Sequence, residues 1–326
     1  MKKNLLHFLG IIITLTIIII GIIKLGYWLR PIDTDGAYEQ VETFHSLPQN
    51  SVEVIAYGSS YVLRGLNTME MYKQYGIGAY NYAWHWQHIN TTRTFMEDSF
   101  LTQKPKLALI ETSHAGYVLE DTNMVGEIYY TRYLKNKKAV FYYLKQCFKR
   151  DIGRYLSYII PLSAFHDNWE WLEQQNFEVL AKDGSYLKNM GFVPTEASVP
   201  ITLSDPNQHE QYELENNAIE ELDKIVALCK KNNVEILFYT VPYANGYYWN
   251  DAMEKYAYKN GCAYLNLFKY IEEIGIDSEK DYFDSGHFNT SGATKVANFL
   301  GNYIRENYDL TDMRTIEGNV WQQNLK

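Results

Sequence analysis

Residues 54–60 read Val54-Ile55-Ala56-Tyr57-Gly58-Ser59-Ser60. A run of apolar residues that stops at a glycine is typical of a short buried strand, here beginning near Ser51 and ending in a turn. A helical pattern follows from Tyr61 to Tyr75, and Gly76 interrupts it. We therefore expect a strand, a turn and a helix, with two serines at the junction of strand and helix.

The rest of the chain repeats this alternation of short apolar runs with amphipathic segments. Strands that alternate with helices at such spacing predict a parallel sheet covered by helices on both faces. The expected fold class is therefore α/β, as a three-layer α/β/α sandwich. Further strands are expected at 79–83, 107–110, 234–241 and 263–268, and further helices at 88–103, 210–232, 252–259 and 291–307.

The amino-terminal segment is almost wholly apolar from Leu5 to Ile23, and Lys2 and Lys3 precede it. At ~1.5 Å per residue the run spans about 28 Å, close to the hydrocarbon thickness of a membrane. The basic residues favour a cytoplasmic amino terminus, and no small-residue cleavage site follows the run. We expect an uncleaved signal anchor over 1–29, with everything after Trp28 outside the cytoplasm.

Three further segments depart from the regular alternation. Residues 30–50 are mixed and polar, with two prolines, and are expected to form a tether. The stretch from about 121 to 208 is rich in tyrosine, tryptophan and lysine. It predicts a mostly helical insertion that packs on the sheet, leans on the membrane or holds sugar rings. The main domain is expected over 51–310, and a carboxyl-terminal tail over 311–326.

The formal net charge of the chain is −9 at pH 7. This charge argues against nucleic acid as a partner, because phosphate binding needs a basic face. The three cysteines Cys147, Cys229 and Cys262 are an odd number without metal-ligand spacing. They fit buried apolar positions better than a disulfide framework, although one pair stays open. We expect neither a cofactor nor a metal site.

A carboxylate and an imidazole lie three residues apart in the stretch Asp284-Ser285-Gly286-His287-Phe288-Asn289. A serine becomes a nucleophile when a base takes its proton, and the base needs an acid partner that fixes its tautomer. Ser60 lies where the first strand ends, and open α/β sheets place their ligands at this edge. The chain therefore contains the parts of a Ser-His-Asp site in the order Ser60, Asp284, His287.

Each part of this site also has a purely structural interpretation. Ser59 or Ser60 alone would be read as a cap of the following helix. An isolated Asp-x-x-His is a capping or surface pair, and a zinc site lacks obvious third and fourth ligands nearby. His85 and His88 flank Trp86 and either line the cleft or are simply packed. The combination of the two motifs with the order of the elements favours catalysis.

The two motifs resemble those of the SGNH (GDSL-like) hydrolases, which have a Gly-Asp-Ser block after the first strand and an Asp-x-x-His block before the last helix. Ser60 takes the nucleophile position, Ser59 replaces the aspartate, and Asp284 and His287 match the last block. The resemblance covers roughly 51–120 and 210–306 and implies a flavodoxin-like sheet. With a single membrane anchor, the chain is similar to the branch containing the teichoic acid D-alanyl-transfer protein and the alginate and peptidoglycan O-acetylation proteins.

The middle blocks depart from the family pattern. The second block supplies a glycine N–H to the oxyanion hole, but the matching stretch 81–86 contains no glycine. The third block usually supplies an Asn side chain, for which Ser113 or His114 could substitute, unless His114 is an ordinary loop residue. Loss of one oxyanion donor costs about 10²–10³ in rate, which suggests a weakened or specialised site. The candidate oxyanion and substrate residues are Ser59, Trp86, Ser113 and His114.

The resemblance implies a membrane-anchored serine acyltransferase or esterase outside the cytoplasm that acts on O-acyl groups of a cell-surface polysaccharide through an acyl-enzyme. It also implies a cell-envelope glycan or teichoic-acid-like substrate, and a membrane-bound O-acyltransferase partner that delivers the acyl group. Two alternatives stay open. One is a carbohydrate esterase that only hydrolyses its substrate. The other is a catalytically degenerate glycan-binding or assembly subunit.

Overall fold

A computed structural model describes residues 2–120, 125–180, 182–203, 211–244 and 249–325. The chain divides into two compact units. The helical unit contains residues 1–38, 120–133 and 144–181, and the sheet unit contains residues 39–119, 134–143 and 182–326. The long amino-terminal helix belongs to the first unit, and the sheet belongs to the second.

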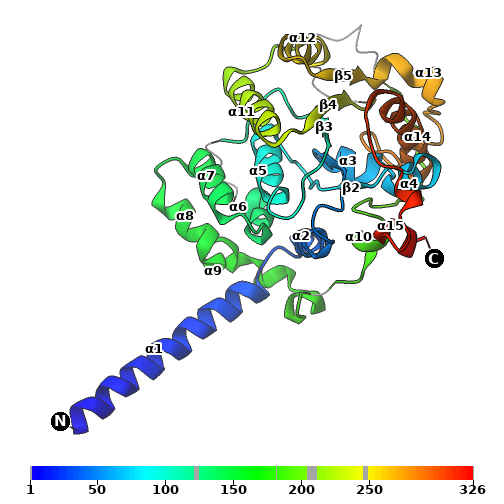
Figure 1. Ribbon diagram of the computed structural model, residues 1–326. Coiled ribbons are helices and arrows are strands. Elements are labelled where there is room, and N and C mark those ends of the chain that lie inside the picture. The colour runs from blue at the N-terminus through cyan, green and yellow to red at the C-terminus, as the bar shows by residue number, and fades with distance from the viewer. Residues whose placement is uncertain (1, 121–124, 181, 204–210, 245–248, 326) are drawn as a thin grey trace. The chain divides into compact units, whose positions relative to one another are not determined.

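A five-stranded parallel sheet forms the centre of the sheet unit (Figure 1). Its strand order is β2-β1-β3-β4-β5, the order of flavodoxin-like sheets. β1 and β3 are buried along their whole length, as expected for strands covered on both faces. The α/β fold class is thereby confirmed. The strands are β1 (Val54–Tyr57), β2 (Ala79–Asn81), β3 (Leu107–Glu111), β4 (Glu235–Thr240) and β5 (Ala263–Asn266).

Helices cover both faces of this sheet (Figure 1). On one face α5 (Ile89–Ser99) packs against α11 (Asn216–Asn232). On the other face α14 (Thr290–Asn307) packs against α3 (Ser60–Gly65) and α4 (Thr68–Tyr75). Further helices of the unit are α10 (Ser185–Lys188), α12 (Asn250–Asn260), η6 (Leu267–Tyr270), α13 (Ile271–Ile274), η7 (Met313–Thr315) and α15 (Val320–Gln323).

The segment that we expected as one helix from Tyr61 to Tyr75 is two helices, α3 and α4. The backbone is extended at Leu66 and Asn67, and the Asn67 side chain accepts a hydrogen bond from the N–H of Glu70 at the start of α4. An asparagine competes with the helix for backbone N–H groups and therefore favours a cap over a helix interior. The single-helix prediction was wrong for this reason.

Residues 30–50 contain a packed helix, α2 (Asp35–Ser46), where we expected a tether. Ala37, Val41 and Phe44 are buried, and their spacing of four and three residues places them on one helix face. Phe44 stacks on Tyr82 with ring centroids 4.2 Å apart. Polar residues lie between these apolar positions, so the overall composition of the segment does not reveal the apolar face.

The insertion expected over 121–208 is mostly helical where it is described, while 121–124, 181 and 204–208 lie outside the described residues. The predicted helix from 210 to 232 likewise begins at a residue outside them, and α11 starts at Asn216. The insertion contributes α6 (Val125–Ile128), η2 (Tyr129–Tyr133), α7 (Lys137–Phe148), α8 (Ile152–Ile159), α9 (Pro161–Phe165), η3 (His166–Trp171) and η4 (Gln174–Phe177), besides α10.

The helical unit begins with α1 (Lys2–Trp28), which the short helix η1 (Ile32–Thr34) follows. Among the described residues, α1 is the one helix long and apolar enough to cross a membrane. Its segment Asn4–Trp28 has a mean hydropathy of 2.7, and none of its most apolar window is buried within the protein. By length and composition α1 fits a membrane span or a signal sequence.

The carboxyl-terminal tail packs on the β2 edge of the sheet. Trp321 in α15 is fully buried, and its indole N–H donates a hydrogen bond of 3.0 Å to the carbonyl oxygen of Ala79 in β2. A Cβ at Gly78 would lie 3.1 Å from the Trp321 ring, so the tail approaches the strand closely. The tail therefore covers a strand edge that would otherwise expose unpaired backbone groups.

Replacing Trp321 by alanine is expected to lower the free energy of unfolding by about 3–5 kcal/mol, because the change leaves a cavity and an unpaired carbonyl. Chemical denaturation followed by circular dichroism measures this effect. Tyr258 is 88% exposed and provides the control, for which Tyr258→Ala should change the free energy by less than about 0.5 kcal/mol. Equal effects of the two substitutions would contradict a structural role for the tail.

Candidate active site

Ser60 is the first residue of α3 and follows β1 after a turn of Gly58 and Ser59. Gly58 has a φ of +148°, and a Cβ there would lie 2.9 Å from the Cβ of Glu111, so the turn requires glycine. The buried Ser59 accepts a hydrogen bond from the N–H of Tyr61 and caps α3. Ser60 itself is half-buried.

Sheet topology determines where Ser60 lies. β1 pairs with β2 on one side and with β3 on the other, so the chain order reverses between β1 and β3. Open α/β sheets bind their ligands at such a switch point, outside the carboxyl ends of the strands. Ser60 follows β1, and residues 112–114 follow β3. Both segments therefore lie at the edge where a ligand is expected.

The loop that precedes α14 is anchored at both ends. The buried Asp281 accepts hydrogen bonds from the Ser291 hydroxyl at 2.7 Å and the Lys295 ammonium group at 2.6 Å. Asn289 caps α14, and its backbone N–H donates to the carbonyl of Asp281 at 3.0 Å. These contacts fix the ends of the loop that carries the acid and the imidazole.

Ser60, His287 and Asp284 form a hydrogen-bonded relay. The Nε2 of His287 lies 2.7 Å from the Oγ of Ser60, and its Nδ1 lies 2.9 Å from each carboxylate oxygen of Asp284. Because a carboxylate only accepts hydrogen bonds, Nδ1 carries the ring proton and Nε2 accepts from the Ser60 hydroxyl. The geometry is that of a nucleophile, a base and an acid that orients the base.

The Asp-x-x-His spacing creates a second set of contacts within the same turn. The Oδ1 of Asp284 accepts hydrogen bonds of 2.8 Å from the backbone N–H groups of Gly286 and His287. Burial raises the pKa of Asp284, but these N–H groups and the His287 side chain outweigh it, so the pKa lies below its usual value. The turn therefore positions both groups and keeps the carboxylate ionised.

Tyr61 packs against the base of this relay. Its ring centroid lies 5.3 Å from that of His287, 5.6 Å from that of His114 and 5.2 Å from that of Tyr243. A Cβ at Gly286 would lie 3.2 Å from the Tyr61 hydroxyl oxygen. The residue next to the nucleophile thus supports the imidazole through ring packing.

The end of β3 carries a second buried carboxyl group, Glu111. Its Oε1 accepts hydrogen bonds from the N–H and the hydroxyl of Ser113, and its Oε2 has no hydrogen-bond partner among the described residues. Burial raises the pKa of Glu111 to about 7, although hydrogen bonds lower it in part. The Ser113 hydroxyl is therefore committed to Glu111.

Three buried or half-buried histidines lie in the loops after β2 and β3. Burial lowers the pKa of His85, His88 and His114 to about 4 in each case. Electrostatic interactions with Arg64 and His287 lower the pKa of His85 further, and those with His88 and His287 lower that of His114. The Nδ1 atoms of His88 and His114 are buried and have no hydrogen-bond partner within the described part of the chain. At neutral pH these three rings are uncharged.

Trp86 projects from the loop after β2. Its side chain is 67% exposed, and its backbone has a φ of +54°, a left-handed conformation that a bulky residue rarely adopts. The ring lies edge-on to His114 with a centroid distance of 5.9 Å. A strained backbone that holds a large aromatic ring in solvent is typical of a binding position.

The expected site residues fall into two groups. The structure brings together Ser60, His287 and Asp284 by hydrogen bonds. His114 is linked to the relay indirectly, because its ring contacts that of Tyr61, and Trp86 in turn contacts His114. Ser59 and Ser113 instead make local bonds within their own turns. The sequence analysis missed Tyr61 and Glu111. The signals that could have found them are an aromatic ring directly after the nucleophile and a carboxyl group that ends an apolar strand.

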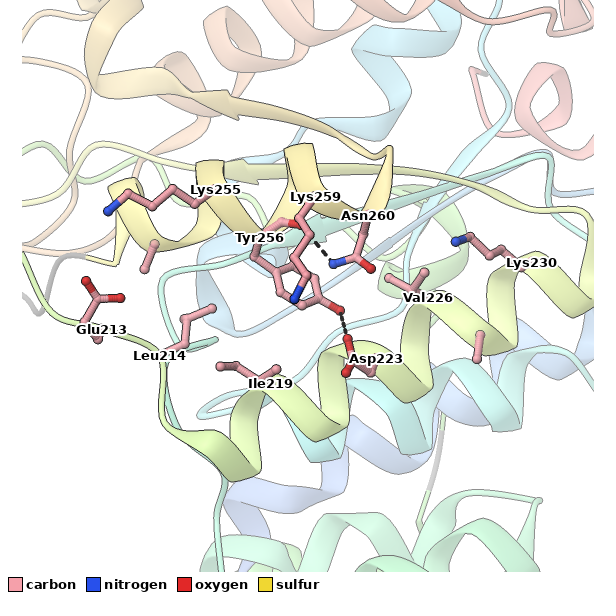
Figure 2. A pocket seen from close by; sticks show the side chains of 12 residues that line it. Glu213, Leu214, Ile219, Asp223, Val226, Lys230, Lys255, Tyr256, Lys259 and Asn260 are labelled. Atoms are coloured by element: carbon pink, nitrogen blue, oxygen red, sulfur yellow. Dashed lines mark hydrogen bonds between the residues drawn. The ribbon is translucent and has the colours of Figure 1, made fainter.

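A cavity of about 590 Å³ lies between α11 and α12, and none of the three relay residues lines it (Figure 2). The Tyr256 hydroxyl donates a hydrogen bond of 2.8 Å to Asp223 inside it. Burial raises the pKa of Tyr256, so the phenol stays protonated. Lys230, Lys255 and Lys259 also line the cavity. Within the described residues, no group of three or more His, Cys, Asp or Glu side chains could hold a metal ion.

Glu111 is expected to make folding stability depend on pH. Between pH 4.5 and about 7 the folded protein keeps a proton on Glu111 that the unfolded protein has lost, so this group's contribution to stability falls as the pH rises through that range. Glu111→Gln removes the contribution. The stability of the wild type relative to Glu111→Gln should therefore decrease from pH 5 to pH 8. Melting temperatures of both proteins at the two pH values measure this, and a constant difference would contradict it.

The chain matches no known protein-family model and no curated protein sequence. Among solved structures, it is similar to one from Bacteroides fragilis NCTC 9343 described as a "putative acylhydrolase", with a TM-score of 0.40 and 12% sequence identity. The match covers 82% of this chain and 94% of that chain.

Proposed function

We propose that this protein is a serine acyl-transfer enzyme of the SGNH type that acts outside the cytoplasm on O-acyl groups of a cell-surface polysaccharide. The observation that carries the proposal is the relay from Ser60 through His287 to Asp284, with distances of 2.7 and 2.9 Å. The relay lies at the switch point of the sheet, where a substrate carbonyl can approach the hydroxyl. An intact relay supports an enzyme over a glycan-binding subunit that has lost activity.

In the first half of the proposed reaction, the Ser60 oxygen attacks the carbonyl carbon of an acyl ester while the Nε2 of His287 takes the hydroxyl proton. The ionised Asp284 stabilises the imidazolium that forms. The tetrahedral intermediate then collapses, the carbon–oxygen bond of the leaving alcohol breaks, and His287 returns the proton to that oxygen. The product of this half is an acyl-Ser60 enzyme.

In the second half, a hydroxyl group attacks the acyl-enzyme. His287 takes the proton of the incoming hydroxyl as its oxygen bonds to the acyl carbon. The bond between that carbon and the Ser60 oxygen then breaks, and His287 returns the proton to Ser60. A sugar hydroxyl as the attacking group gives transfer, and water gives hydrolysis. The same three residues serve both outcomes, so access to the acyl-enzyme decides between them.

Backbone N–H groups near Ser60 are the proposed donors to the oxyanion. The Ser60 N–H begins α3 and can face the developing charge. In the stretch 81–86, the N–H groups of Asn81, Tyr82 and Trp84 already donate to other acceptors, which leaves the rest of that loop to supply a second donor. Since the Ser113 hydroxyl is bonded to Glu111, His114 is the better candidate for a side-chain donor.

A glycan is the proposed acceptor because of Trp86. An exposed indole offers a flat apolar face on which a sugar ring can lie, and the strained backbone indicates that its position is maintained at a cost. The resemblance to polysaccharide O-acylation proteins points to the same class of acceptor. It also implies that a membrane-bound O-acyltransferase supplies the acyl group, and that α1 anchors the protein in the cell membrane as a single span.

Hydrolysis alone is the second candidate function. The His287 side chain is 24% exposed and the Asp284 side chain 40% exposed, so water can reach the relay. A carbohydrate esterase would need no second substrate. The two candidates share the relay and differ in the fate of the acyl group.

A fluorophosphonate probe tests the enzyme proposal. Wild-type protein should be labelled, Ser60→Ala should lose labelling, and Asp284→Asn should label about 10⁴-fold more slowly because the acid no longer fixes the tautomer. Ser59→Ala is the matched control and should keep labelling, with a loss of stability of about 0.5–2 kcal/mol from the missing cap. Absence of labelling in the wild type would favour the binding subunit.

Acyl transfer and the role of Trp86 are tested together with an acetylated glycan, with and without added acceptor glycan. Transfer predicts acetylated acceptor as a product, and release of free acetate alone would reject transfer in favour of the esterase.

Trp86→Gly tests the role of the indole, because glycine adopts the left-handed backbone without strain and the substitution removes only the ring. It should raise the KM for the glycan about tenfold and leave the rate on a small aryl acetate unchanged. An unchanged glycan KM would contradict a role of Trp86 in acceptor binding.

A further inference from the structure

The helical unit contains a cavity of about 690 Å³ with the amino-terminal helix as one wall. Residues near the end of α1 form that wall, and residues from the junction of α8 and α9 also line the cavity. α1 packs against α9, so these walls belong to one packed body. The apolar lining residues are Ile19, Ile22 and Ile23 from α1, with Ile159, Ile160, Pro161 and Leu180.

Polar and aromatic groups complete the lining of this cavity. Arg30 lies 4.1 Å over the Tyr27 ring and donates to both carboxylate oxygens of Asp35 at 2.8 and 2.7 Å. Arg132 lies 4.5 Å over the Tyr129 ring. Tyr27 is eight residues beyond Ile19 on α1, a rise of about 12 Å. The cavity therefore combines an apolar region on α1 with two guanidinium groups, and one of them, Arg30, lies just beyond the end of that helix.

Other parts of the same unit also expose apolar side chains. On α8, Ile152, Leu156 and Ile159 are exposed and recur at a spacing of four and three residues, which forms one stripe. On η3, Trp169 and Trp171 are 63% and 77% exposed. Exposed apolar stripes of this kind are typical of helices that lie in the membrane interface, where tryptophan is enriched.

We propose that this cavity binds an acyl chain of an anionic phospholipid from the surrounding bilayer, with the phosphate near Arg132. The proposal rests on the proposed membrane anchoring by α1 but not on the acyl chemistry of Ser60. If α1 spans the membrane, its isoleucines lie within the hydrocarbon, so the cavity opens to lipid. A hydrocarbon chain matches the apolar wall, and a phosphate matches a guanidinium. The lipid would fix the helical unit at the bilayer surface.

The test uses the full-length protein in nanodiscs that contain a phosphatidylglycerol with a photoreactive acyl chain. Ile22→Trp fills the cavity from the α1 side and should lower cross-linking about tenfold. Ile20 is exposed on α1 and does not line the cavity, so Ile20→Trp is the matched control and should cross-link like the wild type. Arg132→Gln should remove the preference for phosphatidylglycerol over phosphatidylcholine in competition.

Circular dichroism and thermal melting of each variant establish that it is folded. Equal cross-linking of Ile22→Trp and Ile20→Trp would overturn the proposal, and so would a cross-link to a second protein chain in place of lipid. Ser60→Ala should bind the probe lipid as the wild type does. A wild-type protein that is not labelled by the fluorophosphonate but still cross-links to lipid would therefore reject the acyl chemistry alone. A wild-type protein that is labelled but does not cross-link to lipid would reject the lipid site alone.

Discussion

The arrangement of the site depends on the parallel pairing of β1 with β2 and β3. This pairing makes β1 an interior strand of the sheet. Its carboxyl end therefore lies at the point where the order of the chain reverses. The turn at Gly58 then leads directly into α3, so the hydroxyl of Ser60 emerges at that point. The loop before α14 reaches the same edge because α14 packs on α3 and α4. One topological constraint thus brings together residues that are 227 positions apart in the chain.

Several of the groups near the relay are buried and uncharged at neutral pH. Burial lowers the pKa of the three neighbouring histidines to about 4, and it raises that of Glu111 to about 7. Asp284 departs from this trend because backbone N–H groups in its own turn stabilise the carboxylate. The imidazolium proposed to form on His287 therefore has a fixed anion beside it and neutral rings around it. Such an environment strengthens the interaction between acid and base, since few other charges compete with it.

The sequence was sufficient for the parts of the fold and site that have local signals. Short apolar runs located the strands, the first of which Gly58 ends, and the Asp-x-x-His spacing indicated the turn that contains both side chains. Other features depend on contacts with distant residues. The face of α2 that contains Phe44 is buried because Phe44 stacks on Tyr82. The tail is held by a hydrogen bond from the Trp321 indole to the Ala79 carbonyl. The break between α3 and α4 depends on which of several polar residues acts as a cap, and composition does not decide that.

Tyr61 follows Ser60 directly in the chain, and its ring packs on that of His287. The backbone thus connects the nucleophile to the same aromatic group that supports the base. We expect this ring to couple the thermal displacements of the two segments, so that the distance between the Ser60 oxygen and the His287 nitrogen varies less than the position of either segment alone. Warming should for this reason loosen the remainder of the loop before it separates the reacting pair.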